Sequence, residues 1–204
     1  VGPMATTVWM GVLYVLKRYQ EALDASTSLL AVIEERVAAL PHVPEFWFLR
    51  GLTAAELLPT APASQRPRLR ACTRVSLAKL RRFARQGPDN FAHQALLLEA
   101  SCAFAAGRIK RAMELYRQAT ERARKQGYHQ HAAIACERRA ELCLIEQLPY
   151  EAAQELARGM NLYGDWGARA KVDQLLEDYR ELFQDYPLPS GTLTARSARS
   201  TGTH

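Results

Sequence analysis

Residues 100–159 read ASCAFAAGRIKRAMELYRQATERARKQGYHQHAAIACERRAELCLIEQLPYEAAQELARG, and this stretch decides the fold. Apolar residues recur in it at helical spacing, and Gly107, Gly127 and Pro149 interrupt the pattern. Glycine commonly follows the end of a helix and proline commonly begins one, so the stretch divides into successive helices. The pattern therefore predicts helical hairpins and an all-α fold.

Small residues recur at fixed offsets in two of these hairpins. Ala112 follows Ala100 at the same offset at which Ala152 follows Ala140, so the two pairs of alanines are in register. Small side chains on both helices of a hairpin let the backbones approach closely, as tetratricopeptide-like repeats require. The expected packing residues of these repeats are Gly51, Ala71, Ala100, Gly107, Ala112, Tyr116, Ala119, Ala140, Ala152, Leu156, Gly159 and Trp166.

Helical patterns also occupy the rest of the chain. The expected helical segments are 8–40 with a break near residues 17–19, 46–58, 68–86, 91–106, 109–126, 129–147, 149–163 and 168–183. We expect about four hairpins in an irregular right-handed superhelix, because the spacing from Ala112 to Ala152 exceeds the usual repeat of about 34 residues, followed by a closing helix. Residues 1–183 would form this repeat domain, and residues 184–204, rich in Gly, Ser, Thr and Arg, would form a disordered tail or linker.

Composition supports a globular helical protein. The chain has 204 residues, of which 48% are hydrophobic, 24% charged and only 8% aromatic, which favours packed helices over a sheet. No apolar run reaches the roughly 20 residues of a membrane-spanning helix, and the opening stretch does not resemble a secretory signal. The four cysteines show no CxxC spacing, so reduced thiols in a cytoplasmic protein are expected.

A basic segment is the main candidate binding site. The net charge is +6, and residues 65–86 contain eight Lys or Arg residues without any Asp or Glu. Five arginines share one side of the predicted helix: Arg66, Arg70, Arg74, Arg81 and Arg85. They suggest either an acidic protein or peptide partner or, as the alternative, phosphates of a nucleic acid, although Phe83 is the only nearby aromatic residue for base stacking. A solvated basic face with no partner is the simplest interpretation.

The segment Tyr116–Leu175, with its ending WGA-x-x-KV-x-x-L, resembles a known class of proteins. It is similar to the tetratricopeptide-like helical region of multidomain signalling proteins that combine a serine/threonine-kinase-like domain, an AAA or STAND-type ATPase, a GAF domain and a sensor histidine kinase. The stretches FWFLRGLTAAELL and GPDNFAHQALLLEA extend the resemblance to roughly residues 44–183. The matching residues in the better-matched part are Tyr116, Ala119, Gly127, Ala133, Glu137, Ala140, Ala152, Tyr163, Trp166, Gly167, Ala168, Lys171, Val172 and Leu175. The resemblance implies a linker and interaction arm with protein, peptide or neighbouring-domain partners and no catalytic residue.

Motifs for catalysis are not found in the sequence. It contains no GxxxxGK[ST], HExxH, GxSxG or Gly-rich kinase loop, so we expect neither an enzyme nor a cofactor or metal site. Glu137, between Ala133 and Ala140, is expected to form a structural salt bridge if it is buried. His129 and His131 are expected to be exposed near the start of a helix, and Trp166 is expected to pack against the preceding hairpin.

Overall fold

The computed structural model describes residues 2–36 and 42–187, and all the regular structure in these two ranges is helical. The all-α prediction is therefore confirmed. The helices are α1 (Pro3–Val15), α2 (Tyr19–Arg36), α3 (Val43–Leu57), α4 (Arg66–Gln86), α5 (Pro88–Ala105), α6 (Ile109–Lys125), α7 (His129–Ile145), α8 (Pro149–Asp165), α9 (Arg169–Asp178) and α10 (Arg180–Asp185). Within the described ranges, no helix combines the length and the apolar character needed to cross a bilayer.

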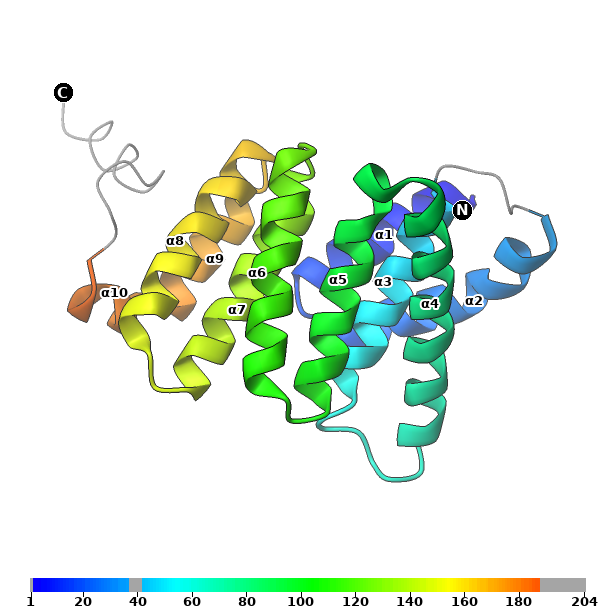
Figure 1. Cartoon of the computed structure of the whole chain (residues 1–204), viewed down its shortest axis with the longest axis horizontal. Helices are drawn as coiled ribbons and strands as arrows, with labels where there is room; N and C mark the ends of the chain where they lie inside the picture. Colours follow the sequence, from blue (N-terminus) through cyan, green and yellow to red (C-terminus); the bar gives the residue numbers. More distant parts are fainter. Residues whose placement is uncertain (1, 37–41, 188–204) are drawn as a thin grey trace. The chain divides into compact units, whose positions relative to one another are not determined.

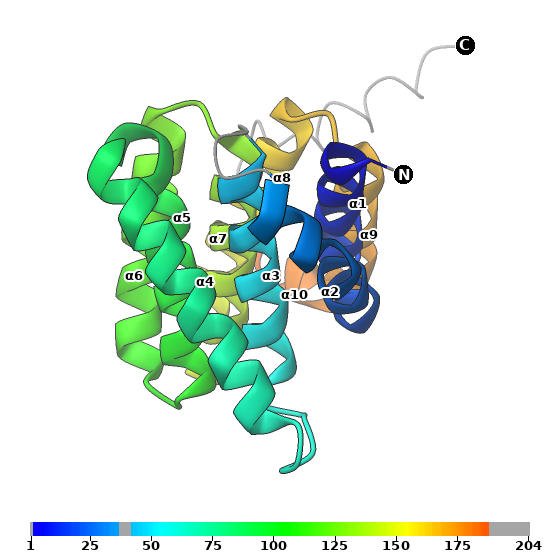
Figure 2. The ribbon, with the colours of Figure 1, turned by 90° about the vertical axis from the view of Figure 1, so that its right-hand side faces the viewer.

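The chain divides into two compact units, the first ending at Leu115 and the second beginning at Tyr116, inside α6. In the first unit each of the helices α1 to α4 packs on the next, and α3 also contacts α1 and α5. The helices are labelled in Figure 1, and Figure 2 shows α3 between α4 on one side and α1 and α2 on the other. In the second unit α8 contacts α7, α9 and α10. This packing between helices that are neighbours in the sequence agrees with the expected hairpins.

Proline begins half of the helices in the described ranges. Pro3, Pro44, Pro67, Pro88 and Pro149 each occupy one of the first two positions of a helix. The fixed φ of proline suits the first turn, where its missing N–H would have no intrahelical acceptor. Consequently α3, α4 and α5 begin two or three residues earlier than expected from the sequence, because Pro44, Pro67 and Pro88 were expected to lie in the connections between helices.

Five connections share one turn geometry. The turn residues have a positive φ and are Lys17, Gly107, Gly127, Gln147 and Gly167. After each of them, the next backbone N–H donates to the carbonyl five residues before it, at 2.8–2.9 Å, as in a Schellman cap. The last four turns are evenly spaced along the chain, and the spacing from Ala112 to Ala152 spans two of these intervals. Each repeat suggested by the spacing from Ala112 to Ala152 therefore contains two helices.

Helix α3 is the core helix of the first unit. Twelve of its 15 residues are buried, since its sequence is apolar on nearly all sides. A Cβ atom added at Gly51 would lie 2.7 Å from Cβ of Ser76 on α4 and 2.6 Å from a methyl carbon of Leu98 on α5. Gly51 therefore allows both neighbouring helices to approach α3 closely, as expected for a packing residue.

Most of the other expected packing residues are buried as well. The buried ones are Ala100, Ala112, Tyr116, Ala119, Ala140, Ala152, Leu156 and Gly159. In the second unit, a Cβ atom at Gly159 would lie 3.3 Å from Cβ of Cys136, so this glycine marks a close approach between α7 and α8.

Three of the expected packing residues are not fully buried. Ala71 is only half-buried, because α4 turns Leu69, Thr73, Ser76 and Leu80 inward instead. Gly107 is exposed in a turn with φ +73°, where a Cβ would touch nothing within 4 Å. Trp166 follows the end of α8 with 47% of its surface exposed, so the indole does not fill the core.

The C-terminal part also differs from the expectation. The closing helix is interrupted at Tyr179, where ψ is 25°, so two helices, α9 and α10, replace one. The second of them continues to Asp185, two residues beyond the expected end of the domain. The predicted tail lies outside the described residues from 188 onward, as do residues 37–41 of the first expected hairpin.

Candidate functional site

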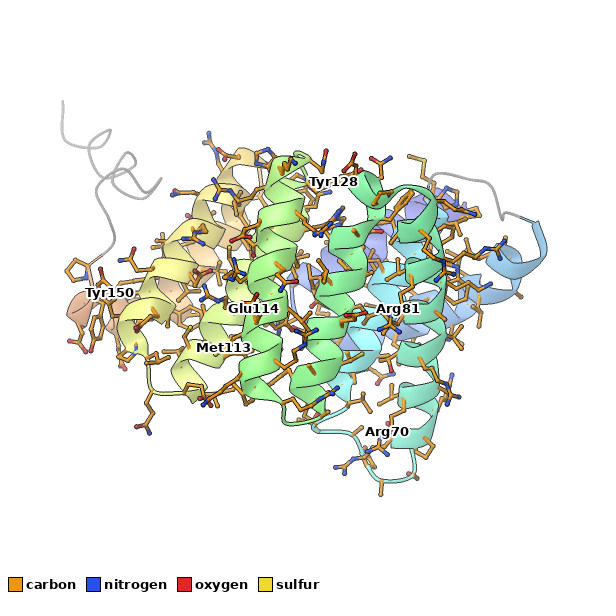
Figure 3. All side chains as sticks on the ribbon, viewed as in Figure 1. Arg70, Arg81, Met113, Glu114, Tyr128 and Tyr150 are labelled. Carbon is orange, nitrogen blue, oxygen red and sulfur yellow. The ribbon has the colours of Figure 1, made fainter. Side chains whose placement is uncertain are left out.

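The basic face of α4 is the site that the sequence predicted, and its five arginines are all exposed. Two of them are already engaged. Arg81 donates through Nε and Nη2 to Oε1 of Glu99 on α5, at 2.9 and 2.5 Å, and Arg66 donates through Nε to the carbonyl oxygen of Ala61 at 2.9 Å. Figure 3 labels Arg70 and Arg81, which lie well apart along α4. The freely presented charge is therefore that of Arg70, Arg74 and Arg85, whose side chains make no hydrogen bond or ion pair with another described residue.

Aromatic residues of α4 do not add a base-stacking surface. Phe83 is half-buried and packs on Phe91 of α5, with 5.8 Å between the ring centroids. The ammonium of Lys79 lies 5.4 Å from the ring centre of Trp47 on α3, which is itself buried. Stacking platforms supply much of the affinity for single-stranded nucleic acid, so α4 alone offers only charge.

Replacing Arg70, Arg74 and Arg85 by Glu tests the function of this face. The three side chains are exposed, so we expect the midpoint of thermal unfolding to change by no more than a few degrees. If α4 binds phosphates, the variant loses binding to a short DNA duplex, and the wild-type affinity falls steeply as salt rises. Fluorescence anisotropy over a range of salt concentrations measures both effects. Unchanged binding in the variant would show that the face is only solvated.

An apolar surface on α1 was missed by the sequence analysis. Residues 3–16 contain no charged side chain. One side of the helix, with Met10, Leu13 and Tyr14, is buried in the first unit. The opposite side exposes five large apolar side chains, which belong to Met4, Val8, Trp9, Val12 and Leu16. The charge-free run was the available signal, and it was read only as too short to span a membrane.

A buried ion pair connects three helices of the second unit. Nζ of Lys171 on α9 lies 3.0 Å from Oε1 of Glu137 on α7, and the hydroxyl of Tyr163 on α8 donates to Oε2 at 2.9 Å. All three side chains are buried. The salt bridge expected for Glu137 is therefore confirmed, although its partner is a lysine from a helix that the sequence analysis had not connected to it.

Another buried acidic residue of this unit, Glu155 on α8, is neutralised by two arginines. The carboxylate of Glu155, which is buried, lies 2.5 Å from Nη1 of Arg139 on α7 and 3.3 Å from Nη1 of Arg158. Each of these carboxylates has a cationic partner, so the two networks are explained by packing of α7, α8 and α9. Neither arrangement resembles a catalytic acid and base.

The histidines give a mixed result. His129 is partly exposed, and its Nδ1 lies 3.7 Å from a carboxylate oxygen of Asp165. His131, in contrast, is 2% exposed and its ring stacks on Tyr128 with an interplanar angle of 9°, so the expectation of an exposed His131 was wrong. Periodicity did not reveal this, because a stacked imidazole can replace an apolar residue in a core. No group of three potential metal ligands occurs among the described residues.

The four cysteine thiols are free, with Cys72 and Cys102 half-buried and Cys136 and Cys143 buried. Burial raises the pKa of Cys136 to about 12 and raises the pKa values of Cys72, Cys102 and Cys143. The thiolate is the nucleophilic form, so at neutral pH these residues stay protonated. A thiolate nucleophile is therefore not supplied by any of the four.

Comparisons with known proteins add no relative. No family model, curated protein or solved structure matches the chain. The candidate sites consequently rest on the residues and geometry given above.

Proposed function

We propose that this chain is a non-catalytic protein-interaction module. The observation that carries the proposal is the outer face of α1, where apolar side chains are exposed in a helix without charge. Contiguous exposed apolar surface on a soluble domain usually marks a site where another protein binds. Aromatic and methionine side chains, here Trp9 and Met4, are enriched in such interfaces.

The chemistry of α1 favours a protein surface over a membrane surface. An interfacial membrane helix presents Lys and Arg beside its apolar face and leaves its polar face in water. On α1 the side opposite the apolar face is instead packed into the first unit, through Met10 and Leu13. The expected occupant is thus an apolar protein surface, either on a separate protein or on another domain of the same polypeptide.

The finer description is part of the same proposal. We infer a tetratricopeptide-like array of hairpins in an irregular right-handed superhelix, acting in the cytoplasm as the helical arm of a signalling ATPase-kinase protein. Evenly spaced turns and buried alanines at matching offsets support the repeat, and the resemblance of residues 116–175 supports the signalling context. The alternative function is nucleic-acid binding through α4, which the acid-free basic helix favours.

A paired substitution tests the apolar face. Val8→Glu with Val12→Lys places an ion pair at i and i+4 on α1, which supports the helix while removing the apolar contact. We expect at least a tenfold loss of affinity for the protein partner, because central apolar contacts dominate interface energies, with unchanged thermal unfolding. Partners captured by the wild-type chain are titrated against both proteins by isothermal calorimetry.

The matched control is Arg169→Glu with Asp173→Lys, which places the same ion pair on the exposed side of α9. It should retain wild-type affinity. Equal loss in both variants would assign the effect to charge, and full affinity in the α1 variant would refute the proposed interface.

A further inference from the structure

The first unit contains a cavity between α2, α3 and α4, with a volume of about 270 Å³. Its walls are mostly apolar, and they include Leu23 and Leu30 of α2, Trp47 of α3, and Leu69 and Val75 of α4. The cavity volume is just below the range of roughly 300–1,000 Å³ of pockets that bind drug-sized molecules in proteins. It suits a compact ligand with an apolar body.

A buried cation, Arg50, also lines this cavity. Its side chain extends from the core helix α3, and only 9% of the residue is exposed. Nη1 donates to Oγ of Ser26 at 2.5 Å and to Oγ1 of Thr27 at 3.3 Å. The described residues provide Arg50 with hydroxyl partners and no carboxylate.

This arrangement is unusual because hydroxyls do not neutralise charge. A buried cation is costly unless an anion accompanies it, and the second unit follows that rule with Lys171 and Glu137. Guanidinium has five N–H donors in a planar fork, and the contacts to Ser26 and Thr27 use Nη1 only. The remaining edge of the fork matches the two oxygens of a carboxylate.

A second cation and an exposed apolar residue are found at the same cavity. Arg68, on α4, is exposed and contributes to its lining. Val75 on the same helix also lines it, yet 43% of this apolar residue is exposed to solvent. A ligand in the cavity would cover part of this side chain and would place its charge between apolar walls and arginine.

We propose that the cavity binds a carboxylate attached to a compact apolar group, with Arg50 holding the carboxylate and the leucines and Trp47 enclosing the apolar group. This site goes beyond the proposed interaction face and does not depend on it, because none of the cavity residues belongs to α1. The carboxylate can come from a free small acid or from the C-terminal residue of a peptide, which share this chemistry.

Calorimetry with matched probes tests the proposal on the full chain. The first probe is 4-phenylbutyrate, and the neutral control is 4-phenylbutanamide. We expect the acid to bind at least tenfold more tightly than the amide to the wild-type protein. Acetyl-phenylalanine and a short peptide ending in Phe, each compared with its C-terminal amide, then distinguish a free acid from a chain end as the preferred source.

Substitution of the arginine provides the second arm. Arg50→Met keeps an unbranched side chain, and Ser26 retains its hydrogen bond to the carbonyl oxygen of Leu23 at 2.6 Å. The variant should bind acid and amide equally, whereas Arg82→Met, an exposed change elsewhere on α4, should bind like the wild type. Circular dichroism establishes that each variant is folded.

A third readout uses the wild-type protein only, so it does not depend on how well a variant folds. Cys72 lines the proposed cavity and Cys102 does not. Saturating 4-phenylbutyrate should slow alkylation of Cys72 at least threefold and leave Cys102 unchanged, as measured by peptide mass spectrometry. Equal binding of the acids and their amides, or no binding and no protection at millimolar concentrations, would overturn the proposal.

Discussion

Replacement of Lys171 by Met is expected to lower the free energy of unfolding of the second unit by about 3–5 kcal/mol. The substitution keeps the apolar stem of the side chain but removes the ammonium group that lies 3.0 Å from Oε1 of Glu137. Tyr163 still donates one hydrogen bond to that carboxylate, but a neutral donor does not offset a buried charge. Urea denaturation followed by circular dichroism measures the loss.

The double variant Glu137→Gln with Lys171→Met separates charge from packing. It removes both charges and leaves an amide that can still accept from Tyr163, so we expect it to recover more than half of the lost stability. Lys125→Met removes an exposed lysine of α6 and should change the free energy of unfolding by less than about 0.5 kcal/mol. A loss below about 1 kcal/mol for Lys171→Met would mean that Glu137 finds another partner or reaches water.

The second large effect is expected for Ala112→Glu. Ala112 is 0% exposed and lies five residues after the turn at Gly107. The equivalent positions after three other turns are Ala22, Ala132 and Ala152, and each of them is also 0% exposed. A glutamate side chain does not fit there without displacing neighbouring side chains, and water would not solvate its charge.

We expect this substitution to cost more than about 3 kcal/mol, because overpacking and a buried unpaired charge act together. Thermal unfolding monitored by circular dichroism provides the measurement. Arg111→Glu is the matched control, since Arg111 precedes Ala112 in the same helix and is exposed. Similar melting temperatures for Ala112→Glu and the wild type would contradict the register of α6.

The sequence was sufficient to predict those helices that have a clear apolar periodicity and a glycine in the adjoining turn. Gly107 and Gly127 stand at turns with positive φ, and the expected segments on either side agree with α5, α6 and α7 to within a few residues. The turns at Lys17 and Gln147 have the same geometry without glycine, so residue type alone did not reveal that all five turns are alike. The hydrogen bonds from the N–H groups of Arg18 and Leu148 close these two turns and hold Lys17 and Gln147 in the left-handed region at an energetic cost.

The errors in α4 have a different physical origin. Ala71 was assigned to the packed side of α4 because it is small, yet Thr73 and Ser76 occupy that side. The hydroxyl of Thr73 donates to the carbonyl oxygen of Arg70 at 2.9 Å, so this polar residue is satisfied within its own helix and can be buried. The apolar pattern does not indicate that these polar residues are buried. Ser76 is buried because α4 closely approaches α3 at Gly51, a contact between residues that are distant in the sequence.

The candidate sites show the same division. The exposed arginines of α4 follow directly from the sequence, because a charged stripe at helical spacing is exposed almost by necessity. The cavity at Arg50 could not be predicted, because the stretch FWFLRGL gives no indication that its arginine meets hydroxyls of α2 instead of a carboxylate. That pairing depends on how α2 and α3 cross.

The regular turns have a consequence for changes in chain length. Each added residue rotates the following part of a helix by about 100°, which would turn buried positions toward solvent. Between Gly107 and Gly167 every helix is bounded by such turns, so insertions and deletions there should be much more harmful than substitutions. The connection from Leu58 to Gln65, between α3 and α4, lies outside this spacing, and its exposed residues 63–64 should accommodate additional residues without altering either helix.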